Sequence, residues 1–248
     1  MAEKVHSKYE IVVNDVTANI RVYTSDEEYV PIYEILIPIV KDATEAALDD
    51  IRERLIDELD LRPAEIISPE EMTQLKKRFT DKAMELLKKE FPKLNPANYK
   101  TLVGLLLQQS LGLGIIEFLL QDQNLEEVVI NSSKEPIWVY HIKRGWLKTN
   151  ILISNENQIY EYSASIGRRV GEQITNLSPL MDAYLPSGDR TNATLFPISS
   201  DGNTMTIRKF ARRPWTISDF IQQNTLSLDM AAFLWLAIQY EMNIVIAG

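Results

Sequence analysis

The sequence predicts an α+β fold in two successive domains, residues 1–95 and 96–210. Three observations carry this prediction. Residues 9–40 are rich in Val, Ile, Tyr and Thr, a helical spacing of apolar residues follows, and from residue 127 strand-like runs alternate with a single long helix. With 248 residues, of which 45% are hydrophobic, the chain can bury a sizeable core.

The first predicted domain is a small antiparallel sheet followed by helices. Turn residues at 14–15 and 25–28 divide residues 9–40 into strands. A helix runs from Asp42 to Pro63, and a second opens at Ser68 with proline at its first position and ends at Pro92. Asn95 caps a third helix, which runs to residue 112.

The second predicted domain places sheet and helix in separate segments. We expect a short helix at 115–121, strands at 127–131, 137–142 and 146–153, a helix capped by Ser154, a hairpin over 183–196 and a strand at 204–210. The hairpin turns at residues 186–189, whose composition is typical of a turn.

The last part of the chain has a different character. Residues 211–216 have linker composition and include Arg212, Arg213 and Pro214. Residues 217–248 predict helices capped by Ser218 and Ser227. The face of Leu228, Ala231, Leu234 and Ile238 is expected to be buried, and a buried parallel strand over 243–248 is expected to follow. Because a parallel strand needs a covering helix, we expect this chain to be part of a longer protein.

Composition excludes several classes of function. The absence of cysteine removes disulfides, thiolate nucleophiles and cysteine zinc sites, and it fits a reducing, cytoplasmic compartment. His6 and His141 are the only histidines, too few for most metal or hydrolase sites. No run reaches the roughly 18 apolar residues of a membrane span, so direct membrane insertion is not expected. The net charge of −9 disfavours non-specific nucleic-acid binding.

Basic residues nevertheless gather in one segment. Residues 164–215 hold four acidic and seven basic side chains, and six of the seven are arginines, whose planar fork suits phosphate oxygens. The hairpin and the following strand predict that Arg190 and Arg208 approach each other as an anion clamp. The alternative is a solvated face with a salt-bridge network between domains.

Two motifs in this segment resemble a known family. They are the run Ser-Pro-Leu-Met-Asp-Ala-Tyr-Leu-Pro-Ser-Gly-Asp-Arg at 178–190 with Asn-Ala at 192–193, and Thr-Ile-Arg-Lys-Phe at 206–210. From Leu111 onward the chain is similar to the N-terminal part of the type II/type IV secretion ATPase superfamily, with closest resemblance to its archaeal pilus, archaellum and tight-adherence branch. Tyr184 and Ser187 depart from the pattern, where the family often has arginine and aspartate.

The resemblance implies a function for the arginines. In this family the N-terminal domain closes over ATP and Mg²⁺ bound to a RecA-like P-loop motor domain, so Arg190 and Arg208 are expected to face the phosphates, with Asn192 and Lys209 in support. Gly248 would be the first glycine of the Walker A loop, and 217–248 the start of a truncated motor domain. The isolated chain is therefore expected to be catalytically inactive and to bind no cofactor tightly.

The resemblance also implies partners. The parent protein is expected to be a homo-hexamer at the cytoplasmic face of the membrane, working with a polytopic membrane platform protein and other secretion or pilus components. Two alternatives remain at this point: a non-catalytic adaptor of the same fold, and a nucleic-acid binder that uses the basic segment. The second is disfavoured by charge and by the lack of interleaved aromatic residues.

Overall fold

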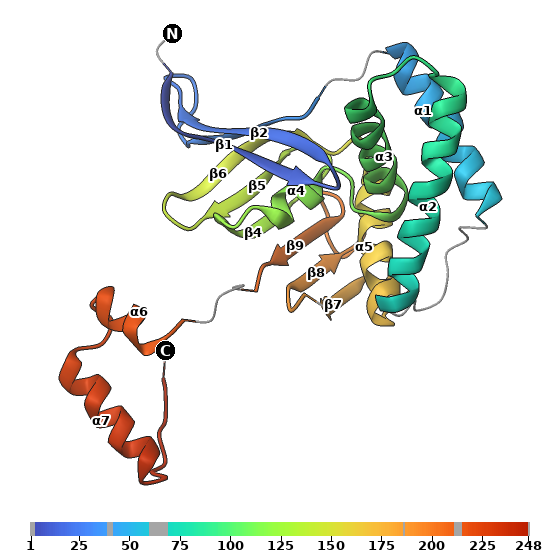
Figure 1. Cartoon of the computed structure of the whole chain (residues 1–248). Helices are drawn as coiled ribbons and strands as arrows, with labels where there is room; N and C mark the ends of the chain where they lie inside the picture. The colour runs from blue at the N-terminus through green and yellow to red at the C-terminus, as the bar shows by residue number, and fades with distance from the viewer. Residues whose placement is uncertain (1–2, 39–41, 60–68, 186, 211–214, 248) are drawn as a thin grey trace. The chain divides into compact units, whose positions relative to one another are not determined.

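The computed structural model describes residues 3–38, 42–59, 69–185, 187–210 and 215–247 (Figure 1). By their internal contacts the residues form two units, Met1–Phe210 and Ala211–Gly248, which are described separately. The strands of the first unit are β1 (Lys4–Val13), β2 (Val16–Thr24), β3 (Ile32–Leu36), β4 (Leu125–Ile130), β5 (Pro136–His141), β6 (Gly145–Leu152), β7 (Leu180–Tyr184), β8 (Arg190–Thr194) and β9 (Thr204–Arg208). Its helices are α1 (Asp42–Glu58), α2 (Pro69–Glu90), α3 (Pro96–Leu111), α4 (Ile116–Gln121) and α5 (Glu156–Val170).

One mixed sheet organises this unit and confirms that the chain combines helices and strands. Its order is β1-β2-β3-β6-β5-β4-β9-β8-β7, visible in Figure 1 from the blue strands to the brown ones. Neighbouring strands are antiparallel except β3 and β6, which are parallel. The predicted hairpin is present as β7 and β8, and the predicted strand at 204–210 is β9.

The β3–β6 pairing differs from the predicted division at residue 95. Two backbone pairs join the strands, Ile32 with Lys148 and Tyr33 with Thr149. Beyond these two pairs, the side-chain amide of Asn150 joins the strands. Its Oδ1 accepts from the Ile35 N–H at 2.8 Å and its Nδ2 donates to the Ile35 carbonyl at 3.0 Å. The predicted N-terminal sheet thus continues into the sheet of the second predicted domain, and residues 1–210 form one unit.

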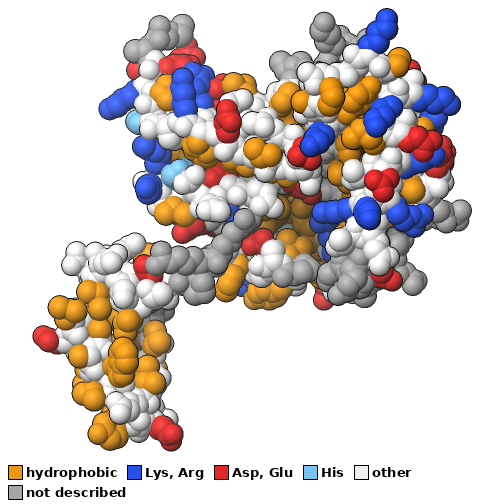
Figure 2. All heavy atoms as spheres, viewed as in Figure 1, with side chains coloured by type: hydrophobic (Ala, Val, Ile, Leu, Met, Phe, Trp, Pro, Cys, Tyr) orange, Lys and Arg blue, Asp and Glu red, His pale blue; other side chains and the backbone are white. Residues whose placement is uncertain are grey.

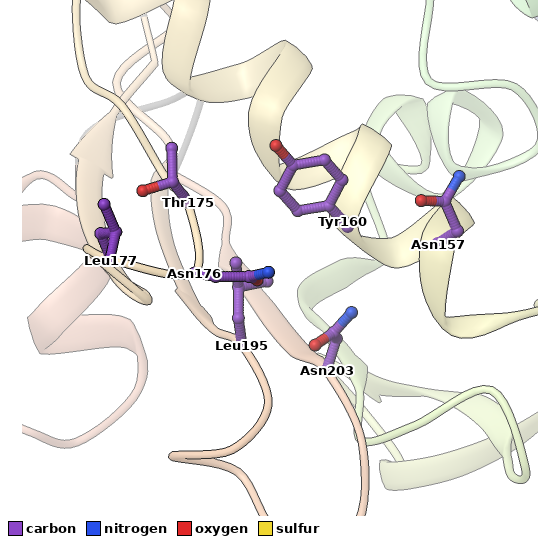
Figure 3. A pocket seen from close by; sticks show the side chains of 7 residues that line it. All are labelled: Asn157, Tyr160, Thr175, Asn176, Leu177, Leu195 and Asn203. Carbon is purple, nitrogen blue, oxygen red and sulfur yellow. The ribbon is translucent and has the colours of Figure 1, made fainter.

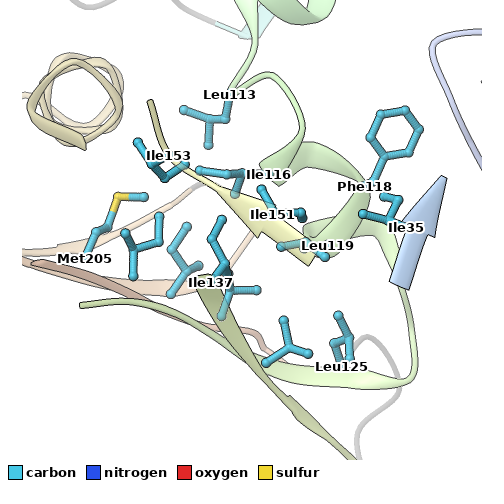
Figure 4. Close-up of a cluster of buried hydrophobic side chains, with 14 of the residues drawn as sticks. Ile35, Leu113, Ile116, Phe118, Leu119, Leu125, Ile137, Ile151, Ile153 and Met205 are labelled. Atoms are coloured by element: carbon cyan, nitrogen blue, oxygen red, sulfur yellow. The ribbon is translucent and has the colours of Figure 1, made fainter. Parts of the chain in front are cut away.

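The main core lies between the sheet and helices α4 and α5. Figure 4 shows side chains of β3, α4, β5, β6 and β9 converging in it. Its members include Ile35, Phe118, Ile137, Ile151 and Met205, each at most 5% exposed. Because β-strand side chains alternate between faces, this packing directs the intervening residues of β4 to β9 to the opposite face.

A second core joins the three long helices. Leu55 of α1, Phe79 and Leu87 of α2 and Leu106 of α3 are fully buried there. Helix α3 also lies against the β1–β2 hairpin, where a Cβ atom on Gly104 would stand 1.9 Å from the carbonyl oxygen of Asn14. Only glycine permits this approach.

Two of the four predicted caps that lie among the described residues are confirmed. Asn95 caps α3, its Oδ1 accepting from the Ala97 N–H at 3.1 Å, and Ser227 caps α7 (Leu228–Gln239). For α5 the prediction of Ser154 is wrong by one position, since the Oδ1 of Asn155 accepts from the Gln158 N–H at 2.9 Å. In α6 (Ile217–Gln222) the prediction of Ser218 is also wrong, because Thr216 forms a capping box with Asp219.

The second unit contains α6 and α7, and it corrects two expectations. Leu228 and Ile238, expected on a buried face, are 72% and 68% exposed, and Figure 2 shows hydrophobic side chains gathered over this segment. Residues 243–247 form no strand, although a buried parallel strand was predicted. A strand needs a neighbour to take its backbone hydrogen bonds, and the described part of this unit offers none. Within the described residues, no helix is long and apolar enough to cross a membrane.

Candidate functional site

The predicted clamp arginines lie directly opposite each other. In the β8–β9 ladder, Arg190 pairs with Arg208. The next residues inward, Thr191 and Ile207, are fully buried in the core, so the two arginines occupy the open face of the sheet. Both are exposed. The juxtaposition inferred from the hairpin and the following strand is therefore present.

Arg190 is held by the neighbouring strand. Its Nε and Nη2 donate to the two carboxylate oxygens of Asp182 at 2.9 and 2.6 Å, and its guanidinium lies 5.8 Å from the ring centre of Tyr184. The bond from Arg190 lowers the pKa of the Asp182 carboxyl, and Asn192 assists. Asp182 in turn raises the pKa of Arg190, so the pair is fully charged at neutral pH.

Arg208 differs from Arg190 in its side-chain contacts. Among the described residues it forms no salt bridge or side-chain hydrogen bond, although Glu127 lies opposite it on β4. Like charges placed directly opposite in a ladder destabilise it, and Asp182 neutralises only one of the two. The face therefore carries an uncompensated guanidinium next to a compensated one, an arrangement that attracts an anion.

Asn192 and Lys209, the two predicted supporting residues, fall on different faces. Asn192 is exposed and pairs across the strands with Asp182 and Thr206, one row from the arginines. The Nζ of Lys209 donates to the backbone carbonyls of Leu119 and Asp122. A cation there stabilises the C-terminal end of α4 and is turned away from the arginine face.

Arg169 has a similar structural contact. Its Nη2 donates to the Leu111 carbonyl at the end of α3 at 2.7 Å, and burial lowers its pKa. Its neighbour Arg168 on α5 is exposed, whereas Arg169 is only partly exposed. Four other predicted residues, Arg212, Arg213, Pro214 and Gly248, lie outside the described residues.

Sequence reasoning missed a polar hollow beside α5. It has a volume of about 660 Å³. Figure 3 shows its lining: Asn157, Tyr160, Thr175, Asn176, Leu177, Leu195 and Asn203. The amide of Asn203 is already engaged, accepting from the Phe196 N–H and donating to the Glu156 carbonyl, both at 2.9 Å. Asparagines scattered over 47 residues give no sequence signal for such a site.

The hollow offers no charged group, and no cluster of three or more potential metal ligands occurs in the part of the chain that is described. On the arginine face, the N–H donors of the guanidinium groups suit the oxygens of an anion such as phosphate. The carboxylates of Asp182 and Glu127 lie beside these arginines, and Asp182 already accepts two hydrogen bonds from Arg190.

Comparisons with known proteins find relatives of part of the chain. No protein-family model matches the sequence. The chain is 42% identical over 127 residues to one uncharacterized protein of Methanocaldococcus jannaschii, covering 51% of this chain and 18% of the relative. It is 32% identical over 157 residues to a second such protein, covering 63% and 28%.

Another relative is the type IV secretion system protein PtlH of Bordetella pertussis. The chain is 28% identical to it over 110 residues, which is 44% of this chain and 32% of PtlH. The chain is thus similar to a secretion-system protein, as the motifs indicate. It spans well under half the length of each of these relatives.

Among solved structures, the VirB11 ATPase from the Brucella suis type IV secretion system, crystallised with sulphate, has a TM-score of 0.36 and 21% identity, covering 49% of this chain and 43% of that one. At that TM-score the likeness carries no conclusion about fold or function.

Proposed function

We propose that this chain is the nucleotide-clamping region of a secretion or pilus-assembly ATPase of the archaeal and tight-adherence branch. The observation that carries the proposal is the direct pairing of Arg190 with Arg208 on the open face of the sheet, inside both family motifs. The similarity to PtlH supports the general class of secretion-system protein.

In this proposal the ATP-binding loop belongs to a motor domain that begins in residues 217–248, with Gly248 at the entry to the Walker A loop. That domain would bind Mg²⁺ and carry out hydrolysis. The residues of this chain hold and orient the phosphates: two guanidinium groups present several N–H donors to them, and Arg208 is the group with no ion pair among the described residues.

Closure follows from charge. When phosphates approach, they attract Arg208 and compete with Asp182 for Arg190, which draws the sheet face toward the nucleotide. Residues 211–216, with Arg212, Arg213 and Pro214, would act as the hinge, and a hexameric parent would pass this motion to a polytopic platform protein at the cytoplasmic face of the membrane.

The test is a titration of the chain with inorganic tripolyphosphate and with ATP, followed by calorimetry. Arg190→Ala and Arg208→Ala should each weaken binding of both ligands by about 10-fold or more, because each removes a charge-assisted bond. Arg→Lys at either position should restore part of the affinity, since the charge remains and the fork is lost. Arg168→Ala, an exposed arginine on α5, is the matched control and should bind as wild type.

The same variants distinguish the alternatives. Lower melting temperatures with unchanged ligand binding in both alanine variants would support a salt-bridge role or an adaptor and contradict the clamp. The isolated chain should release no phosphate from ATP and Mg²⁺ above background, because the loop that cradles the triphosphate is not in it.

A further inference from the structure

The arginine pair is part of a longer row that crosses six strands. Successive ladder partners run Tyr184, Arg190, Arg208, Glu127, Tyr140 and Trp146, on β7, β8, β9, β4, β5 and β6 respectively. Figure 1 shows these six strands side by side. Residues from six separate parts of the sequence therefore meet on one line.

The row lies on the open face throughout. Its neighbours along the strands, Ala183, Thr191, Ile207, Val128, Val139 and Leu147, are all at most 4% exposed and point into the core. In the row itself, Tyr184 is 65% and Trp146 43% exposed. Glu127 and Tyr140 are partly exposed. A ligand lying across the strands can reach every member.

The chemical order along the row has a direction. The two guanidinium groups come first, then the Glu127 carboxylate, then the aromatic pair Tyr140 and Trp146, whose rings meet edge to face with centroids 5.3 Å apart. A phosphate chain suits the arginines, a carboxylate accepts hydrogen bonds from ribose hydroxyls, and aromatic rings stack on bases.

The spacing agrees with this order. Neighbouring strands lie about 4.8 Å apart, so Arg208 and Tyr140 are separated by roughly 10 Å across the strands, with Glu127 between them. An extended nucleotide places its ribose between its phosphates and its base over such a distance. At the opposite end Tyr184 pairs directly with Arg190, which leaves no position for a ribose.

We propose that this row binds a nucleoside triphosphate across the strands, with phosphates at Arg190 and Arg208, ribose hydroxyls at Glu127 and the base on Tyr140 and Trp146. The proposal rests on the proposed nucleotide-clamping function and adds recognition of the nucleoside. A single-stranded nucleic acid fits less well, because its repeated phosphates would meet the Glu127 carboxylate on a chain of net charge −9.

The experiment compares ATP, 2′,3′-dideoxy-ATP and inorganic tripolyphosphate on the 248-residue chain. Tyr140→Leu and Trp146→Leu should weaken ATP binding by about 5- to 100-fold, the range expected for loss of base stacking, and leave tripolyphosphate within about twofold of wild type. The conservative Tyr140→Phe keeps the ring and should retain far more ATP affinity than Tyr140→Leu. The exposed Tyr29→Leu is the matched control.

The role of the Glu127 carboxylate is tested by the affinities for the three ligands. Glu127→Gln should strengthen both tripolyphosphate and dideoxy-ATP, because a negative charge beside Arg208 is removed, and should weaken ATP several-fold relative to dideoxy-ATP, because the ribose hydroxyls lose a charged acceptor. Glu135→Gln, an exposed glutamate on the β4–β5 turn, should change none of the three. Thermal melts identify any variant that fails to fold. If a leucine variant does not fold, the difference between ATP and dideoxy-ATP in Glu127→Gln carries the test.

The outcomes separate the two proposals. If arginine variants lose both ligands but Tyr140→Leu and Trp146→Leu bind ATP normally, nucleoside recognition by the row is wrong and the clamp stands. If wild type binds none of the three ligands at millimolar concentration, both proposals fail. Tighter binding of an oligoadenylate than of ATP would also overturn the row as a mononucleotide site.

Discussion

Arg190 and Asp182 form a two-pronged ion pair across the β7–β8 hairpin, with N–O distances of 2.9 and 2.6 Å. Each side chain is about half exposed, so water and ions reach the pair. An incoming phosphate must therefore compete with a carboxylate already bound to Arg190. Asp182 occupies the position on Arg190 that an incoming anion would take.

The first prediction concerns this competition. Asp182→Asn should strengthen tripolyphosphate binding by about twofold to fivefold, because an exposed ion pair of modest strength no longer occupies Arg190. Affinity in the wild type should likewise rise as pH falls through the depressed pKa of Asp182. Asp201→Asn, on an exposed turn, is the control. A loss of affinity in Asp182→Asn would show that Asp182 positions Arg190.

The second prediction concerns the buried carboxylate of Asp122. Its Oδ2 accepts from the hydroxyls of Tyr33 at 2.8 Å and Tyr9 at 2.5 Å, and burial raises the pKa of both phenols. Tyr33→Phe should lower the free energy of unfolding by about 1–3 kcal/mol, since a buried oxygen loses a donor. Denaturant melts measure it, and Tyr29→Phe should have no effect. Equal stability would show that Tyr9 alone satisfies the carboxylate.

The third prediction concerns Gly202, whose φ of 139° favours glycine and whose absent Cβ would lie 2.7 Å from Oε1 of Glu156. That carboxylate also accepts from the N–H groups of Ser133 at 2.7 Å and Asn203 at 2.5 Å, which joins α5 to two loops. Backbone strain at this φ alone costs about 1–3 kcal/mol. Gly202→Ala should therefore lower the free energy of unfolding by more than this amount.

Gly145 provides the matched control for Gly202. It also has positive φ, at 70°, but nothing lies within 4 Å of the position of its Cβ. Gly145→Ala measures strain without a clash. If thermal melts show the two variants to be equally destabilised, the contact with Glu156 contributes nothing.

The fourth prediction concerns His141, which is 5% exposed and whose Nδ1 accepts from the Lys143 N–H at 3.1 Å. Burial lowers its pKa below the ordinary value of 6.5. As pH falls through about 6.5, the unfolded chain binds a proton that the folded chain resists, so stability falls, by at most about 1.4 kcal/mol per pH unit. Melts between pH 7.5 and 6 should show this slope, and His141→Gln should flatten it. An unchanged slope in the variant would assign it to other groups.

Much of the local structure could be predicted from sequence. The β7–β8 hairpin, the Asn95 cap and the strand bearing Arg208 each depend on short-range patterns. The predicted domain boundary at residue 95 was wrong because β3 pairs with β6 and joins the two predicted sheets into one. Composition does not reveal this pairing. The strand predicted over 243–248 is absent from its described residues, 243–247, because an apolar run becomes a strand only beside a partner.

For the site, sequence placed Arg190 and Arg208 together because a hairpin and the next strand are usually neighbours. It could not place Glu127, Tyr140 and Trp146 beside them, since that requires the register of β4, β5 and β6. It also could not distinguish Arg208 from Lys209. Adjacent residues on a strand point to opposite faces, so the ends of the strand had to be known to one residue.

The short parallel junction between β3 and β6 gives the sheet an uneven resistance to opening. Ile35 and Asn150 are 115 residues apart in sequence, and the strands are joined there by two backbone pairs, a bond from the Lys148 N–H to the Pro31 carbonyl and one side-chain amide. The antiparallel ladders on either side are longer. Local opening begins where fewest bonds must break, so the protons of the backbone amides along this junction should exchange with solvent deuterium before those of the β5–β6 ladder. The strands on each side of this junction would thus stay paired with one another while the junction itself opens locally.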